Sequence, residues 1–193
     1  MYRCLIANRG EIAVRIIRAC REMKIETVAI YAKGDEDSLH VSLADQAICI
    51  GEANPLDSYL NIERIISAAE ITGANAIHPG YGFLSESTTF AEAVEENDIH
   101  FIGPNKKTME MMGDKITARQ TVHAANVPVI PGSDGEVESV DEIKKLAEEI
   151  GYPLVLKAAS GGGGKGIRIV KEPEQLEKSL KEAKSEGQKY FND

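Results

Sequence analysis

Residues 4–20 read CLIANRGEIAVRIIRAC, and this stretch decides the fold class. It starts with a short apolar run, residues 4–7, which is typical of a buried strand and which Asn8, Arg9 and Gly10 end. Apolar residues then recur at helical spacing, so the strand leads directly into an amphipathic helix. The face of that helix that we expect to be buried holds Ile12, Ile16, Ala19, Cys20 and Met23.

The alternation of strand and helix patterns continues to about residue 102. Further strands are expected at residues 27–31, 47–50, 74–78 and 99–102. Helices are expected at residues 62–69, with Gly73 closing the helix, and at residues 90–96. Strands separated by helices of this length predict a parallel sheet that is covered on both faces. We therefore expect one α/β domain over residues 1–102.

The pattern changes after this domain. Residues 103–129 are expected to form a helical linker, in which two helices break at Gly113 and Asp114 caps the second one. A smaller α+β unit is expected over residues 130–193. Its helices are expected at residues 140–150 and 175–186, and its strands at residues 154–158 and 167–170. Because an isolated pair of strands is marginally stable, we expect this unit to be truncated, with a natural short protein as the alternative.

Size and composition set limits on the function. The chain has 193 residues, of which 42% are hydrophobic and 27% are charged, which is typical of a globular protein. Its net charge of −9 repels phosphate backbones, so nucleic acid is not an expected partner. No apolar run is long enough to span a bilayer and no secretory signal opens the chain, so we expect no membrane partner and a cytoplasmic location.

The cysteines do not form a recognisable site. Cys4, Cys20 and Cys49 are widely separated, without zinc or redox spacing, and we expect reduced thiols that pack as small apolar groups. No cluster of His, Cys and carboxylate residues has zinc spacing either. We therefore expect no metal ligand in this chain.

The sharpest motif is KAASGGGGKG, residues 157–166, which lies between two apolar runs. Each glycine costs about 0.5–1 kcal/mol relative to alanine in regular structure, and a simple hairpin turn does not need this many. Backbone N–H groups without side chains can close around phosphate oxygens, and Lys157 and Lys165 add positive charge beside them. We expect a loop that covers phosphate. A flexible linker is the alternative, although linkers are usually flanked by polar residues.

A second motif is HPGYGFLSE, residues 78–86, which follows a strand and precedes a helix. In open parallel sheets, ligands bind beyond the carboxyl ends of the strands, so Tyr81 and Glu86 are candidates to face a substrate. The alternative is a tight turn in which Tyr81 packs locally. His78 alone is expected to be a hydrogen-bonded residue at the end of the strand.

A third motif, Asn8-Arg9-Gly10-Glu11, follows the first strand, where a dinucleotide-binding loop would lie. It contains one glycine instead of the Gly-x-Gly-x-x-Gly pattern, and an acid stands where pyrophosphate would bind. The motif therefore argues against an NAD-binding domain.

Together these motifs resemble those of the biotin carboxylases. The resemblance rests on residues 6–13, 78–86, 101–104, 112–115 and 157–168, in the order of the family and over essentially the whole chain. It implies a Rossmann-like first domain followed by an ATP-grasp unit, whose lid would be residues 130–193. It also implies that ATP and bicarbonate form carboxyphosphate, which carboxylates biotin.

The resemblance also implies residues that bind ATP. Lys115 and Lys157 resemble the lysines that hold the ATP phosphates, and Gly163 and Gly164 resemble loop glycines that close on the nucleotide. Ile167 resembles an apolar wall near adenine. The family's magnesium ligands, its catalytic Lys and Arg, and its adenine hinge would lie after residue 193, so no catalytic residue is expected in this chain. We therefore expect the chain alone to be inactive.

Substrate and partner contacts complete the expectation. Tyr81 resembles a residue near biotin, and Arg18 and Glu22 resemble residues at a homodimer contact. The implied partners are a biotin carboxyl carrier protein and carboxyltransferase subunits, as in bacterial acetyl-CoA carboxylase. Pyruvate and propionyl-CoA carboxylases share the motifs, so the carboxyl acceptor stays open. The alternatives are another ATP-grasp ligase, such as a carbamoyl-phosphate synthetase, and a non-catalytic dimerisation module.

Overall fold

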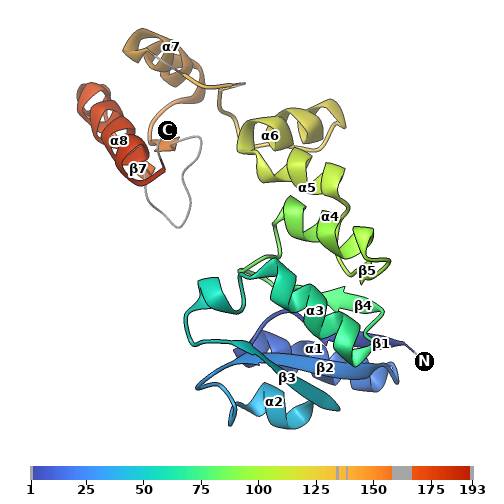
Figure 1. The fold of residues 1–193 in the computed structure, drawn as a ribbon. Helices are drawn as coiled ribbons and strands as arrows, with labels where there is room; N and C mark the ends of the chain where they lie inside the picture. The colour runs from blue at the N-terminus through green and yellow to red at the C-terminus, as the bar shows by residue number, and fades with distance from the viewer. Residues whose placement is uncertain (1, 134, 138, 158–166, 192–193) are drawn as a thin grey trace. The chain divides into compact units, whose positions relative to one another are not determined.

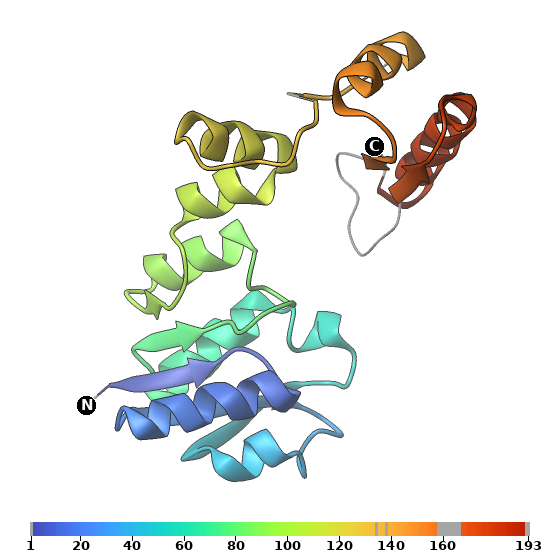
Figure 2. The same cartoon turned by 180° about the vertical axis from the view of Figure 1, so that it is seen from behind.

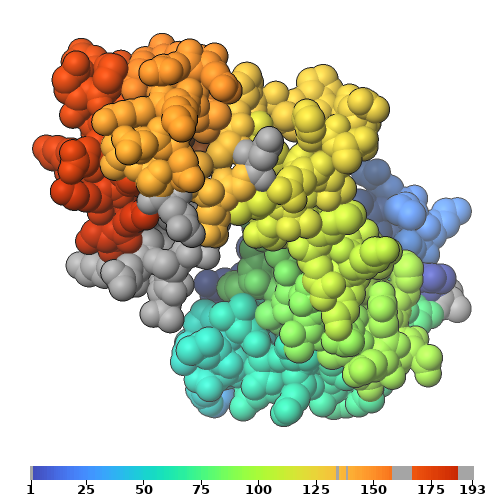
Figure 3. Space-filling view, turned by 90° about the horizontal axis from the view of Figure 1, so that it is seen from above, coloured from blue at the N-terminus to red at the C-terminus, as the bar shows by residue number. Residues whose placement is uncertain are grey.

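The computed structural model describes residues 2–133, 135–137, 139–157 and 167–191. The chain divides into two compact units, Met1–Glu110 and Met111–Asp193. In the space-filling view of Figure 3, colours from blue to yellow-green belong to the first unit, and colours from yellow to red belong to the second. The separate linker over residues 103–129 stays a prediction.

The first unit is built on a parallel sheet, as the alternating pattern predicts (Figure 1). Its strands lie in the order β3-β2-β1-β4-β5, and every neighbouring pair is parallel. The strands are β1 (Arg3–Ile6), β2 (Glu26–Ala32), β3 (Gln46–Gly51), β4 (Ala76–His78) and β5 (His100–Phe101). Parallel strands need crossover connections, and the helices between them supply these.

Helices cover both faces of this sheet. Successive side chains of β1 point to opposite faces, so Cys4 and Ile6 pack with α1 whereas Leu5 and Ala7 pack with α3 and α4. Figure 2 shows the molecule from behind, and in this view α1, drawn in blue, lies in front of the sheet. The α-helices of this unit are α1 (Gly10–Glu22), α2 (Leu39–Leu43), α3 (Ile62–Thr72) and α4 (Thr88–Glu96), and α5 (Lys106–Gly113) crosses the boundary between the two units. The buried central strand explains why residues 4–7 read as a continuous apolar run.

The buried face of α1 differs from the predicted one. The helix buries Ala13, Ile16, Ile17 and Cys20. Ala19 is exposed, and Met23 is 70% exposed, so the prediction was wrong for these two residues. Met23 follows the last residue of the helix, where helical spacing no longer applies. The adjacent residues Ile16 and Ile17 lie on the face of α1 that packs on the sheet.

Two helix ends are formed as predicted. Gly73 adopts a left-handed conformation with φ of 64° after α3, and its N–H bonds to carbonyls of the last turn. Asp114 caps α6 (Lys115–Ala124), because its Oδ1 accepts a hydrogen bond of 2.7 Å from Thr117 N. The two helices expected between residues 106 and 125 therefore meet at this Gly113-Asp114 step.

The second unit contains a small antiparallel hairpin with helices. Its elements after α6 are α7 (Val140–Ile150), β6 (Leu154–Lys157), β7 (Ile167–Val170) and α8 (Leu176–Phe191). Ile143, Val170 and Leu176 form its buried cluster. Arg168 pairs with Glu182 and Glu186, which joins β7 to α8. One face of the hairpin is thus fixed against helices.

Candidate functional site

The order of strands places two of the motifs beside each other. The chain moves from β1 through β2 to β3 on one side, and then returns to form β4 and β5 on the other side of β1. Ile6 and His78, the last residues of β1 and β4, are aligned in register. Ligands bind in open parallel sheets at such a reversal, beyond the carboxyl ends of the strands. The loops of residues 8–9 and 79–87 both start there.

Asn8 connects these two loops. Its side chain is buried, and its Nδ2 donates hydrogen bonds of 2.8 Å to the carbonyl oxygens of Pro79 and Tyr81. Gly80 lies between them with φ of 67°, and a Cβ atom there would lie 2.8 Å from Asn8 Nδ2. This position therefore requires glycine both for its backbone conformation and for the close approach of the amide.

Arg9 holds the same loop through aromatic rings. Its guanidinium lies 5.2 Å from the ring centroid of Tyr59 and 5.7 Å from that of Phe83, within the range of a cation–π interaction. These two rings stack with centroids 5.2 Å apart and planes 4° apart. Arg9 also pairs with Asp35 at 3.2 Å. We call Arg9, Asp35, Tyr59 and Phe83 the Arg9 cluster.

The polar atoms of the Arg9 cluster are paired with one another. Tyr59 is fully buried, and its Oη donates to Asp35 at 2.7 Å and accepts from Ala32 N at 3.0 Å. Burial alone would raise the pKa of Asp35, but the hydrogen bonds from Tyr59 and Arg9 bring it below its usual value. Burial is the main cause that raises the pKa of the Tyr59 hydroxyl, and the hydrogen bond to Asp35 raises this pKa further. Asp35 is therefore held as a carboxylate and Tyr59 as a neutral phenol.

Tyr81 points away from the core. Its side chain is 60% exposed, and its Oη donates a hydrogen bond to the Glu11 carboxylate. Glu86 is also exposed. His78 accepts a hydrogen bond of 3.0 Å at Nδ1 from Gly80 N, and burial lowers its pKa, so it is the hydrogen-bonded residue that we predicted. The side chain of Tyr81 is thus exposed to solvent, whereas the backbone of the loop is held by hydrogen bonds.

The β6–β7 hairpin has a second face that does not pack on helices. Lys157 pairs with Ile167 and Val155 pairs with Ile169 in the strand register, so these side chains share one face. Val155 is 50% exposed, Ile167 38% and Ile169 61%, and Lys157 is exposed as well. The hairpin therefore presents a flat apolar surface that ends at a lysine. Val155 was missed by the sequence reasoning, although its position two residues before Lys157 places it on that face.

The other expected ATP residues are in two places. Lys115 is exposed at the start of α6. Gly163 and Gly164, with the rest of the tetraglycine loop, lie outside the described residues. The structure therefore joins Lys157 to Ile167 but leaves the predicted role of the loop as a prediction.

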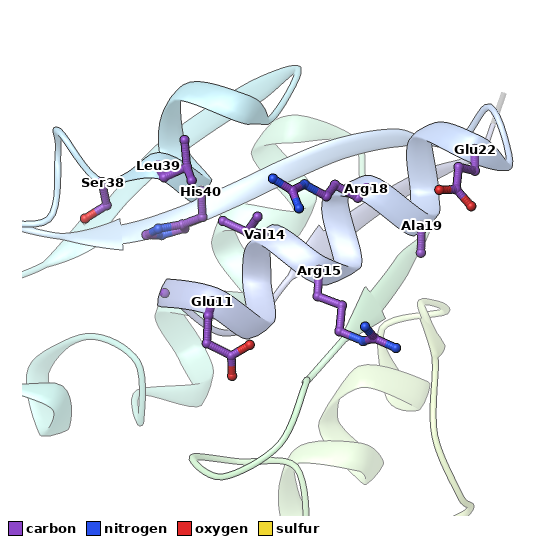
Figure 4. Close-up of a pocket in the computed structure, with 10 residues that line it drawn as sticks. Glu11, Val14, Arg15, Arg18, Ala19, Glu22, Ser38, Leu39 and His40 are labelled. Carbon is purple, nitrogen blue, oxygen red and sulfur yellow. The ribbon is translucent and has the colours of Figure 1, made fainter.

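The expected dimer residues lie on one exposed strip of α1. Arg18 and Glu22 both project from this helix and line a shallow groove with Arg15 (Figure 4). Leu39 of α2 borders the groove and is 58% exposed. The groove combines charged groups with apolar surface, which is suited to a protein contact.

His40 borders this groove but is itself buried, with 1% exposure. Its Nε2 hydrogen-bonds with Ile30 O at 3.2 Å, and Nδ1 has no hydrogen-bond partner. Burial is the main cause that lowers the pKa of His40 below its ordinary 6.5. The folded protein therefore holds the ring neutral at a pH where the unfolded chain is already protonated.

We expect this burial to make stability depend on pH. Below pH 6.5 the unfolded chain binds a proton that folded His40 does not, so the free energy of unfolding falls as the pH falls, by at most about 1.4 kcal/mol per pH unit. His40→Gln keeps a donor for Ile30 O and removes this contribution, whereas His78 continues to act in the same direction. Urea unfolding between pH 7 and pH 5 measures the slope. His100→Gln, at an exposed position, is the control, and an equal slope in His40→Gln and wild type would contradict the prediction.

The cysteines are free thiols, with Cys4 and Cys20 buried and Cys49 exposed. Cys4 interacts with Cys20, and this hydrogen bond together with burial raises the pKa of the Cys4 thiol. Among the described residues, no group of three or more His, Cys, Asp or Glu side chains is arranged to hold a metal ion. Within the same residues, no helix has the length and apolar character needed to cross a bilayer.

Comparisons with known proteins match both units. Residues 1–109 match the biotin carboxylase N-terminal domain, and residues 114–193 match the ATP-binding domain of the carbamoyl-phosphate synthase L chain. Biotin carboxylase 1 of Bacillus subtilis is 54% identical over 187 residues, which are 97% of this chain and 42% of that protein. The chain thus spans less than half the length of this relative.

Solved structures agree with this match. The biotin carboxylase–βγ-ATP complex of Campylobacter jejuni superposes with a TM-score of 0.89 at 51% identity, over 99% of this chain and 43% of that one. The biotin carboxylase domain dimer of Hydrogenobacter thermophilus 2-oxoglutarate carboxylase, with MgADP, ADP and bicarbonate, gives a TM-score of 0.84 at 52% identity, over 98% of this chain and 42% of that one.

Proposed function

Since the chain belongs to the biotin carboxylase family, we propose that the whole protein, meaning this chain with any sequence that continues it, carboxylates biotin with ATP and bicarbonate. The observation that carries the proposal is the free face of the β6–β7 hairpin. Val155 and Ile167 offer an apolar wall for the flat adenine ring, and Lys157 lies at the end of that wall, where a polyphosphate would extend. Lys115 is proposed as a second phosphate ligand.

The reaction follows from the weakness of bicarbonate as an electrophile. A bicarbonate oxygen attacks the γ-phosphorus of ATP, the bond to the β–γ bridging oxygen breaks, and ADP leaves. The resulting carboxyphosphate splits into CO2 and phosphate, and the ureido nitrogen of biotin attacks CO2 as its proton is released. In this scheme the lysines of this chain neutralise phosphate charge and fix its position. Tyr81 lies near biotin.

Magnesium is proposed to bind elsewhere in the whole protein. The metal prefers carboxylate oxygens, and the described part of the chain gathers no suitable group of them. The residues present therefore do not fit a resident Mg2+, and we assign it no step here. For the same reason we propose that the 193-residue chain alone does not turn over ATP.

Partners are proposed from the family and from the surface of α1. Biotin is proposed to arrive on a carboxyl carrier protein, and carboxyltransferase subunits are proposed to receive the carboxyl group, as in acetyl-CoA carboxylase. Pyruvate and propionyl-CoA carboxylases remain alternatives for the acceptor. Arg18 and Glu22 are proposed to contact a second copy, supported by their exposure beside the groove of α1. A non-catalytic dimerisation module is the alternative of another class.

The test measures ADP release by the whole protein. We expect ADP release that depends on bicarbonate and rises when free biotin is added, whereas a carbamoyl-phosphate synthetase would not respond to biotin. The 193-residue chain is expected to release no ADP above background and to leave NADH fluorescence unchanged. ADP release by the whole protein that does not rise when biotin is added would contradict the proposed reaction. Bicarbonate-dependent ADP release by the chain alone would contradict its proposed inactivity.

A further inference from the structure

The Asn8-Arg9-Gly10-Glu11 motif has no part in the proposed binding of ATP, yet the side chains of Asn8, Arg9 and Glu11 all contact the loop of residues 79–87. We propose that Asn8 and Arg9 are positioning residues that orient Tyr81 for biotin. The inference rests on the proposed function, because that function places biotin beside Tyr81. The motif stands where a dinucleotide-binding loop would lie, and that position alone does not suggest this role.

Asn8 is the first residue that holds the loop in place. A buried amide nitrogen that donates to the carbonyls of both Pro79 and Tyr81 at 2.8 Å fixes the backbone on either side of Gly80. Arg9 N donates in turn to Asn8 Oδ1 at 2.9 Å, which sets the orientation of the amide. Because both loop partners are acceptors, only a donor satisfies them. A carboxylate of the same shape would repel both oxygens.

Arg9 is the second residue that holds the loop, and it acts at Phe83, two residues after Tyr81. Its guanidinium lies over the Phe83 ring, and Phe83 stacks on the fully buried Tyr59. The ion pair with Asp35 limits the rotation of the guanidinium. Tyr81 therefore lies between Pro79, whose backbone carbonyl is held by Asn8, and Phe83, whose ring is held by Arg9.

Glu11 completes the arrangement at the tyrosine itself. Its carboxylate accepts the hydrogen bond from Tyr81 Oη, and α1 fixes the position of Glu11. Tyr81 is 60% exposed. These contacts thus contribute mainly to the direction of its ring, and small displacements of a substrate-positioning group reduce catalysis strongly.

The experiment compares Asn8→Asp, Arg9→Lys and Asn97→Asp in the whole protein. Asn97 is an exposed asparagine of the same unit, so Asn97→Asp controls for the added charge. We expect Asn8→Asp to raise KM for free biotin or lower kcat, so that kcat/KM for biotin falls about 10- to 100-fold, while KM for ATP changes less than about twofold. Arg9→Lys keeps the charge at an exposed position but loses the planar stack, and a fall of about tenfold is expected.

A second readout does not depend on catalysis. In the 193-residue chain, Asn8→Asp is expected to accelerate hydrogen exchange at residues 80–83 by about tenfold, with the amides of α3 unchanged. If the variants fold and kcat/KM for biotin is unaltered, or if KM for ATP and for biotin rise together, the positioning role is overturned. If the wild-type whole protein shows no response to biotin, the proposed function has failed, and the exchange data still decide whether Asn8 holds the loop.

Discussion

Lys157→Met is expected to lower kcat/KM for ATP in the whole protein by about 100-fold or more, because it removes a positive charge from the proposed site of the phosphates while the strand stays intact. Lys157 is exposed on β6 and pairs with Ile167 in a register that backbone hydrogen bonds fix, so the substitution has little effect on folding. The methionine keeps the length and the apolar stem of the side chain. The loss therefore reports the charge itself.

Lys171→Met is the matched control for this prediction. Lys171 is an exposed lysine that follows the last residue of β7, in the same unit as Lys157. We expect Lys171→Met to change kcat/KM for ATP by less than about twofold. Steady-state ADP release over a range of ATP concentrations measures both variants, and calorimetric titration of ATP provides a second measurement. Equal values for the two variants would show that the free face of the hairpin does not bind the phosphates.

Tyr59→Ala is expected to lower the free energy of unfolding by about 3–5 kcal/mol, the typical cost of removing a large buried aromatic side chain. The ring is fully buried, stacks on Phe83 and lies beneath the Arg9 guanidinium. Its removal leaves a cavity beneath the guanidinium. It also leaves the amide of Ala32 without the phenol oxygen that it donates to.

Tyr59→Phe separates the ring from the hydroxyl. It keeps the stacking and removes only the hydrogen bonds with Ala32 N and Asp35, for which we expect about 1–3 kcal/mol. Tyr2→Ala, at a position that is 57% exposed, is the control and is expected to change stability by less than about 0.5 kcal/mol. Urea unfolding of the 193-residue chain measures all three variants. A Tyr59→Phe variant as stable as wild type would show that water replaces these hydrogen bonds.

Local pattern predicted most of the fold because the elements of the first unit are strongly periodic. The apolar run of β1 and the helical spacing after it identified the parallel sheet. Helix α2 was missed because its five residues are too few to show a period. The buried face of α1 was predicted only in part, because Ala19 and Met23 lie at helical spacing from Ile12, which packs against the core, yet both are exposed.

The site was predictable only in part, for a physical reason. Tyr81 was predictable because it follows a strand of the parallel sheet, and the carboxyl ends of such strands are where ligands bind. Lys157 ends a strand of the antiparallel hairpin and was predicted from the glycine-rich motif that it opens. The Arg9 cluster joins residues as distant as Arg9 and Phe83, and its formation depends on the order in which the strands assemble. Nothing in the local sequence around Asp35 or Tyr59 indicates that the two share a hydrogen bond.

The different exposure of the cysteines makes the chain convenient for spectroscopy. Cys49 is an exposed thiol on β3, the edge strand, whereas Cys4 and Cys20 are enclosed by α1 and the sheet. A maleimide dye or a nitroxide should therefore attach at one position without any engineered residue. Such a label lies on a different strand from β1 and β4, so its anisotropy or line shape would follow the tumbling of the first unit while the loops that carry Asn8 and Tyr81 stay unmodified.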